Sequence, residues 1–317
     1  MEVCLVTSLP VSPMATELGF EDRPHCPLCG STDRQPVWEA RFNDPLVRAM
    51  LDRFHYSADL EAALGNEHFA LMRCRQCNLL HHARHLDAAG LVRLYRDWTD
   101  QYQVRRFETE HGRLHPGEAG RQKIKLALRL SHLAGRRSPA AADLRLLDFG
   151  CGNGEHLLAA RLIGFRPVGI DFSDTRAAAA RIGGVSVHRD LDAFDAAGEA
   201  AVHAVILSQV LEHLTDPLGL LKAITARMVP GGVMYIGVPD CTGVTVPQSF
   251  HAFHNVQPLE HLNGFTPATL DRMAEAAGLR PLRRPATFLG TSVLQALRSA
   301  AGLFWQPRTT DRFYGFG

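Results

Sequence analysis

Short apolar runs alternate with helix-like runs over the second half of the chain, from residue 144 onward. The apolar runs have strand length, and the segments between them repeat apolar residues at helical spacing. Strands that alternate with helices favour a parallel sheet covered by helices on both faces, a doubly wound α/β fold. The expected strands are 144–150, 167–173, 185–190, 201–210 and 233–239, and the expected helices are 154–164, 174–184 and 217–229.

The first half of the chain lacks this alternation. Pro10, Pro13 and Pro24 interrupt its start, which predicts a loose leader. Apolar residues at helical spacing predict a helix over 44–64 and further helices over 86–135. The expected organisation is a leader (1–24), a cysteine-bounded module (25–85), a helical connector or lid (86–137), an α/β core (138–290), and a helix over 291–304 followed by a coil (291–317).

Composition and charge narrow the class of protein. The 317 residues are 46% hydrophobic and 21% charged, which excludes a disordered or fibrous chain. The net charge of +1 gives no strong field toward nucleic acid or an anionic membrane. No run of about 18 apolar residues predicts a membrane-spanning helix. No basic residue precedes the apolar patch near the N-terminus, so an export signal is not expected and the cytoplasm is the predicted location.

Two CxxC pairs stand 44 residues apart and resemble the two halves of a metal site. Each pair can present two thiolates from one tight turn, and two such turns complete a tetrahedron around Zn²⁺. Four cysteine ligands leave no open position, so the zinc is expected to be structural. Buried reduced thiols are the alternative, and a redox pair is less favoured. The expected ligands are Cys26, Cys29, Cys74 and Cys77, and nearby His25, His81, His82 and His85 are expected at the surface.

A glycine-rich turn follows the first expected strand of the core and leads into a helix. Gly150, Gly152 and Gly154 would let the backbone approach a ligand closely. Asp171 ends the next strand, where a carboxylate can hold both hydroxyls of a ribose. A dinucleotide and S-adenosylmethionine both fit this pattern. Asp148 favours the second, because a carboxylate repels a pyrophosphate and attracts the amino group of a methionine moiety.

At these residues the sequence resembles the class I S-adenosylmethionine-dependent methyltransferases, whose first motif is (D/E)xGxGxG. The resemblance spans roughly residues 120–290 and implies a Rossmann-like sheet. It implies adenine contacts at Asp190 and Leu191, and it matches Ser208 and Gln209 to the family's fourth motif. The predicted cofactor contacts are Asp148, Gly150, Cys151, Gly152, Gly154, Asp171, Phe172, Asp190, Leu191, Ser208 and Gln209.

Two segments offer a histidine as general base, which suits proton transfer near neutral pH. His213 follows the fourth strand of the core, at the end of the sheet where ligands bind. The second segment, 239–265, is a long irregular insertion and therefore a candidate functional loop. Within it, Glu260 and His261 resemble a stretch of zinc-containing sugar methyltransferases, in which this histidine acts as the base. That group tends to have tyrosine where this chain has Pro258, so oxygen and carbon acceptors both stay open.

Other roles are open to the same residues and to the chain as a whole. His261 could instead cap the helix expected at Thr266, and His251, His254 and Glu260 could bind a metal. The preferred acceptor is a small polar metabolite, such as a nucleotide-linked or glycan sugar. The second hypothesis is an RNA methyltransferase whose zinc module binds nucleic acid; the low net charge disfavours it. A non-catalytic binding module is the third, and a homodimer is left open.

Overall fold

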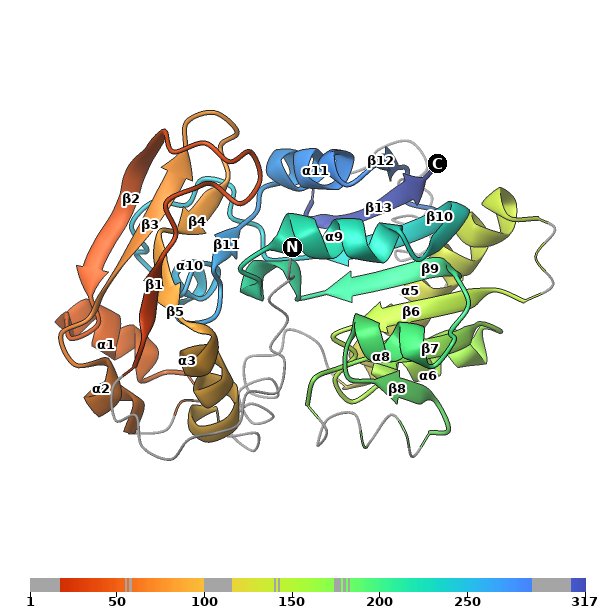
Figure 1. Cartoon of the computed structure of the whole chain (residues 1–317), viewed down its shortest axis with the longest axis horizontal. Coiled ribbons are helices and arrows are strands. Elements are labelled where there is room, and N and C mark those ends of the chain that lie inside the picture. Colours follow the sequence, from red (N-terminus) through yellow and green to blue (C-terminus); the bar gives the residue numbers. More distant parts are fainter. Residues whose placement is uncertain are drawn as a thin grey trace. The chain divides into compact units, whose positions relative to one another are not determined.

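The computed structural model of the chain describes residues 18–54, 56, 59–99, 116–139, 141, 143–173, 178, 181, 183–286 and 309–317. The chain forms two compact units (Figure 1). Unit 1 takes residues 1–113, 212–216 and 240–269, and unit 2 takes residues 114–211, 217–239 and 270–317. The chain therefore leaves unit 2 and returns to it twice. Among the described residues, no helix has the length and apolar character needed to span a membrane.

Unit 2 is built on a seven-stranded sheet of order β12-β13-β10-β9-β6-β7-β8. The five strands from β10 to β8 are parallel, and β13 and β12 add antiparallel pairs at the other edge. This confirms the predicted doubly wound α/β fold. The strands are β6 (Arg145–Phe149), β7 (Arg166–Ile170), β8 (Ser186–His188), β9 (Val202–Ser208), β10 (Met228–Gly237), β12 (Leu279–Leu282) and β13 (Asp311–Phe316).

Helices cover both faces of this sheet (Figure 1). They are α5 (Pro116–Arg137), α6 (Glu155–Leu162), α8 (Leu191–Ala196), α9 (Pro217–Thr225) and α11 (Pro267–Ala276). The 3-10 turn η2 (Leu211–His213) begins at the last residue of one unit 2 segment and continues into unit 1. Helices α5 and α6 pack on each other, α5 on β9 and β10, and α6 on β6 and β7. Their buried side chains join those of the strands in one core that includes Leu130, Leu146, Leu157 and Ile206.

Unit 1 contains a four-stranded antiparallel sheet of order β11-β4-β3-β2 and a separate pair, β1-β5. Its elements are β1 (Phe20–Asp22), β2 (Arg34–Arg41), α1 (Pro45–Leu51), α2 (Asp59–Leu64), β3 (His68–Cys74), β4 (Leu80–His82), β5 (Arg84–Leu86), α3 (Ala88–Arg93), the π-helix η1 (Leu94–Trp98), α10 (Phe250–His254) and β11 (Asn263–Gly264). Trp38, Phe69 and Leu71 of the sheet share a core with Phe253 and Leu259 of the 240–269 segment.

Several expectations for the flanking regions were wrong. The leader contains a strand, because Phe20–Asp22 pairs with β5. The expected coil at the C-terminus is strand β13, which lies between β10 and β12. The helix expected over 44–64 is two short helices, α1 and α2. The tail helix predicted over 291–304 lies outside the described residues, as do residues 1–17 of the leader.

The start of helix α11 agrees with the sequence. Pro267 is its first residue, and the Thr266 hydroxyl accepts a hydrogen bond from the Thr269 backbone N–H at 3.2 Å. The side chain of Thr266 thus satisfies a backbone donor of the first turn, as an N-cap does.

Candidate functional site

The two CxxC pairs come together because a β-hairpin closes the 44 residues between them. Cys26 and Cys29 precede β2, while Cys74 ends β3 and Cys77 lies in the following turn. Pairing of Arg34 with Cys74 places the two turns side by side. The Sγ atoms of Cys26 and Cys77 are 3.5 Å apart, as are those of Cys29 and Cys74. All four sulfur atoms lie within 4.8 Å of one another, and we call this group the cysteine cluster.

The two cysteine turns have the same backbone geometry. The Gly30 N–H donates to the Cys26 carbonyl at 2.9 Å, and the Asn78 N–H donates to the Cys74 carbonyl at 2.9 Å. Gly30 and Asn78 both have positive φ, at 73° and 64°. Two thiolates are therefore presented by each turn in the same way. Zn–S bonds of about 2.3 Å in a tetrahedron require sulfur atoms roughly 3.8 Å apart, so the cysteine cluster has the dimensions of a zinc site.

The histidines near the cysteine cluster are not surface residues, contrary to expectation. His81 and His82 are fully buried in β4 and His85 is 5% exposed in β5, whereas His25 is exposed. Burial lowers the pKa of His81 and of His82 to about 4. At neutral pH these imidazoles are therefore neutral and pack in the core of unit 1. The expectation was wrong because the sequence did not indicate the adjacent strands that bury them.

The glycine loop, residues 150–154, joins β6 to α6 and requires its glycines. Gly150, Gly152 and Gly154 have φ angles of 75°, 51° and 75°, which disfavour any residue with a Cβ. A Cβ on Gly150 would also lie 2.8 Å from Cγ2 of Val210. A Cβ on Gly152 would meet nothing within 4 Å. The loop thus exposes its backbone at Gly152, where a ligand can approach closely.

Asp148 carries a buried carboxylate at the end of β6. It is 1% exposed, and its Oδ2 has no hydrogen-bond partner among the described residues. Burial, together with the nearby charge of Asp171, raises the pKa of Asp148 to about 7. An unsatisfied buried carboxylate is destabilising, and a cation beside it would offset that cost. The amino group of a methionine moiety fits this requirement.

Asp171 connects the end of β7 to the glycine loop. Its Oδ2 accepts the Gly152 N–H at 2.8 Å, and its Oδ1 accepts the Ser173 N–H at 2.9 Å. Each carboxylate oxygen can accept a further hydrogen bond, so ribose hydroxyls remain compatible with these contacts. Phe172 beside it is 63% exposed, although most phenylalanines in the described part of the chain are buried. An exposed ring beside the loop is suited to stacking on a base.

The remaining predicted cofactor residues hold the backbone around this end of the sheet. Asp190 caps α8 by accepting the Ala193 N–H at 2.8 Å, and Leu191 is buried beneath it. Gln209 follows Ser208 with a φ of 56°, and its backbone N–H donates to the Gly237 carbonyl at 2.8 Å. Cys151 is buried, and burial raises the pKa of its thiol to about 12.

The two predicted base histidines come from segments 48 residues apart, but they meet in unit 1. The ring centroids of His213 and His261 are 4.9 Å apart, and those of His254 and His261 are 5.3 Å apart. Glu212 adjoins them, and its Oε1 lies 3.9 Å from Nε2 of His213. We call Glu212, His213, His254 and His261 the histidine cluster.

Burial controls protonation in the histidine cluster. His261 is 5% exposed, and burial lowers its pKa well below the ordinary value, with the neighbouring His213 and His254 adding to the effect. Its Nδ1 has no hydrogen-bond partner among the described residues. Burial raises the pKa of Glu212 to about 8. A neutral imidazole with an available nitrogen can accept a proton or bind a metal ion.

Two tyrosines that the sequence did not indicate contact Glu260 and His213. The Tyr56 hydroxyl donates to Oε1 of Glu260 at 2.5 Å, and the Tyr95 hydroxyl lies 3.2 Å from Nδ1 of His213. Neither tyrosine belongs to a motif, and each lies more than 100 positions from its partner. The alternative metal set of His251, His254 and Glu260 is not among the metal-binding groups found in the described residues.

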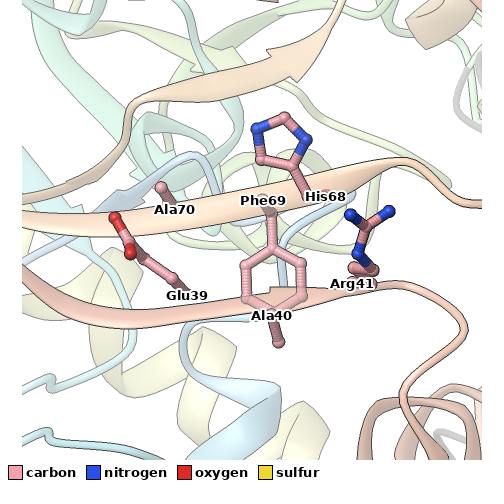
Figure 2. A pocket seen from close by; sticks show the side chains of 6 residues that line it. All are labelled: Glu39, Ala40, Arg41, His68, Phe69 and Ala70. Atoms are coloured by element: carbon pink, nitrogen blue, oxygen red, sulfur yellow. The ribbon is translucent and has the colours of Figure 1, made fainter.

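A shallow pocket of about 400 Å³ lies in unit 1, on strands β2 and β3. Figure 2 shows its lining side chains on strands β2 and β3, with Phe69 between Glu39 and Arg41. None of the predicted cofactor, metal or catalytic residues lines it. It therefore has no evident link to the chemistry of the glycine loop.

Comparisons with known proteins agree with the glycine loop. A family model described as a methyltransferase domain matches residues 121–283. The chain is 30% identical over 154 residues to the ubiquinone biosynthesis O-methyltransferase of Dinoroseobacter shibae, covering 44% of this chain and 61% of that protein. It is 30% identical over 148 residues to the trans-aconitate 2-methyltransferase of Acidovorax sp., covering 45% and 50%. The chain thus matches about half to three fifths of the length of these relatives.

Solved structures include similar methyltransferases. A SAM dependent methyltransferase from Archaeoglobus fulgidus has a TM-score of 0.44 at 19% identity, covering 68% of this chain and 98% of that one. The sugar N-methyltransferase KedS8 from Streptoalloteichus sp. has a TM-score of 0.41 at 18% identity, covering 60% and 85%. The family model spans about half of this chain, from α5 to the end of β12. The chain therefore belongs to the methyltransferase-domain family, with the Rossmann-like sheet expected of class I methyltransferases.

Proposed function

We propose that this protein is an S-adenosylmethionine-dependent methyltransferase that acts on a small polar acceptor. The observation that carries the proposal is the buried Asp148 carboxylate at the end of β6, beside a glycine loop with an open backbone; its Oδ2 has no hydrogen-bond partner in the part of the chain that the structure describes. When bound, the cofactor supplies a methyl group on a sulfonium centre. Asp148 would bind its amino group, the glycine loop would face the methionine moiety, and Asp171 would hold the ribose. Phe172 would stack on the adenine.

Asp171→Ala tests the cofactor half of this proposal. The substitution removes a carboxylate that anchors the Gly152 N–H and is available to ribose hydroxyls. We expect S-adenosylhomocysteine to bind at least about tenfold more weakly, since one or two hydrogen bonds to a charged group are lost. Isothermal titration calorimetry gives the affinity, with exposed Asp192→Ala as the control. Unchanged affinity in Asp171→Ala would remove this residue from the proposed site.

For the acceptor half, we propose that a histidine takes the proton released by the acceptor. The chain runs from β9 into Glu212 and His213, and from β10 into the segment that contains His261. Both segments thus follow the carboxyl ends of parallel strands, where ligands bind in open α/β sheets. We assign His261 as the base because it is neutral and its Nδ1 is available, with Glu260 as its neighbour and His213 as the second candidate.

The proposed reaction balances without a further reactant. His261 would take the acceptor proton, and the oxygen or carbon of the acceptor would use an electron pair to form the new bond to the methyl carbon; for a carbon acceptor this is the pair that the proton leaves behind. The electrons of the broken carbon–sulfur bond would stay on sulfur. We propose an oxygen or carbon of a sugar or comparable polar metabolite as the acceptor, on the resemblance of Glu260 and His261 to sugar methyltransferases.

We further propose that the cysteine cluster binds a structural Zn²⁺. Its four sulfur atoms have the dimensions of a tetrahedral site and leave no position for a substrate. Cys74→Ser is expected to reduce bound zinc below one ion per chain and to lower the melting temperature, because the β2–β3 hairpin loses its closure. Elemental analysis and thermal unfolding provide the measurements, and Cys241→Ser, in a buried thiol outside the cluster, is the control. A full equivalent of zinc in Cys74→Ser would contradict the four-cysteine site.

An RNA acceptor is the second candidate function, and one experiment separates the two. The protein is incubated with methyl-labelled S-adenosylmethionine and a size-fractionated cell extract. We expect label in the small-molecule fraction. Label that nuclease removes from large material would instead support RNA methylation. The cytoplasmic location and a homodimer stay predictions of the sequence.

A further inference from the structure

Three metal-ligating side chains converge within unit 1, apart from the cysteine cluster. Glu212, His213 and His261 each place one ligand atom so that all three atoms lie within 4.8 Å of one another. Glu212 and His213 come from the turn η2, whereas His261 comes from the distant 240–269 segment. The tertiary fold, not local sequence, brings these three groups together.

The Glu212 carboxylate is buried without a hydrogen-bond donor among the described residues. The residue is fully buried, and neither carboxylate oxygen accepts a hydrogen bond from another described residue. Nε2 of His213 lies 3.9 Å from its Oε1, beyond hydrogen-bond distance. Taking a carboxylate out of water without donors costs several kcal/mol. A divalent cation beside both oxygens would offset this cost.

The two ring nitrogens of each imidazole differ in their contacts. His261 is hydrogen-bonded to the backbone of Asn255, while its buried Nδ1 has no hydrogen-bond partner among the described residues. His213 places Nδ1 3.2 Å from the Tyr95 hydroxyl, and its Nε2 faces Glu212. Metal-binding histidines usually have this arrangement, in which the second ring nitrogen contacts a backbone or hydroxyl group and fixes the tautomer.

We propose that Glu212, His213 and His261 bind one divalent transition-metal ion of the Zn²⁺ and Co²⁺ class. Two imidazoles and one carboxylate suit these borderline ions, whereas Mg²⁺ and Ca²⁺ prefer sites made of oxygen atoms alone. Three protein ligands leave an open coordination position, in contrast to the closed cysteine cluster. The ion would therefore be exchangeable and accessible to a small ligand.

Metal binding goes beyond the proposed function and limits it. The Nδ1 atom of His261 cannot hold a metal ion and accept a proton at the same time. A bound ion is therefore expected to inhibit methyl transfer, by roughly 10²-fold or more if His261 is the base. The site would make the activity sensitive to free zinc in the solution.

Direct metal binding tests the proposal without substrate or cofactor. The full-length protein is equilibrated with Zn²⁺, freed of excess ion by gel filtration and analysed for metal. We expect two ions per chain in the wild type, and one in both Glu212→Gln and His261→Gln. Exposed His251→Gln, on helix α10, is the matched control and should keep two. Circular dichroism and thermal unfolding confirm that each variant is folded.

Two results would overturn the metal site: a single ion in the wild type, or two ions in folded Glu212→Gln. Co²⁺ gives a second readout, because ions bound by thiolates and ions bound by histidine have different visible spectra. The histidine-type spectrum should disappear in Glu212→Gln and should remain in the control, His251→Gln. The rate of methyl transfer is followed separately as the second ion binds. A rate that rises instead of falling would overturn the base role of His261 while supporting the metal site.

Discussion

Asp148→Asn is expected to weaken the binding of S-adenosylmethionine by roughly 10²–10³-fold, since a buried charge loses its partner. The amide keeps the shape of the side chain but removes the negative charge that would bind the cofactor's amino group. The same variant is expected to be more stable than the wild type without ligand at neutral pH. The neutral amide avoids the free-energy cost of holding an ionised carboxylate in a buried position.

The direction of the pH dependence follows from the raised pKa of Asp148, about 7 in the folded protein against 3.8 as its ordinary value. Between these values the folded state holds more protons than the unfolded state, so the free energy of unfolding falls as pH rises. Three pKa units correspond to about 4 kcal/mol at most. Asp148→Asn has no carboxyl group to titrate at this position. The difference in free energy of unfolding between the variant and the wild type should therefore be larger at pH 8 than at pH 4.

Calorimetry with S-adenosylhomocysteine and thermal unfolding at both pH values measure the two effects, with exposed Asp192→Asn as the control. Equal affinity in Asp148→Asn and the wild type would contradict the proposed cofactor contact. A stability advantage that is the same at both pH values would contradict the raised pKa. The combination of weaker binding and higher stability would identify Asp148 as a residue that serves function at the expense of the fold.

His261→Ala is expected to lower the rate of methyl transfer by about 10²–10⁴-fold, the usual contribution of a general base. Cofactor affinity should stay unchanged, because the predicted cofactor contacts are on other residues. The assay uses labelled S-adenosylmethionine and the extract fraction that accepts label, with a chelator present so that no exchangeable ion contributes. His251→Ala is the control, since His251 is an exposed histidine of the same segment.

A His261→Ala variant that retains full activity would make His213 the better candidate for the base. Simultaneous loss of cofactor binding would instead indicate a general defect of the fold. Restored turnover with added imidazole would support a proton-transfer role, because imidazole replaces the missing ring and not a missing packing contact.

The parts of the fold that the sequence predicted depend on local patterns. Strands β6, β7, β9 and β10 are mostly apolar, as expected for strands covered on both faces. The glycine loop was found because positive φ values demand a particular residue type at each position. The cysteine cluster could be predicted because two CxxC pairs are the usual sequence pattern of a tetrahedral four-cysteine site.

The unpredicted parts depend on contacts between distant residues. His81 and His82 read as surface residues, yet β3 and β11 flank them on both sides. Strand β13 pairs with β10 although the two strands are far apart in the sequence, and a local pattern cannot reveal such a pairing. The hydrogen bond from Tyr56 to Glu260 joins residues 204 positions apart. Single-sequence reasoning therefore identified candidate residues in the histidine cluster but not their partners.

The split composition of unit 1 has a consequence for the order in which the protein folds during synthesis. Phe253 and Leu259 fill the same core as Trp38 and Phe69, although some 200 residues separate them in the chain. A nascent chain made up to residue 240 has every parallel strand of unit 2 but lacks this part of the unit 1 core. The cysteine turns are synthesised early, but unit 1 can complete its core only after the 240–269 segment has been synthesised. The N-terminal residues are therefore expected to reach their final packing late in synthesis.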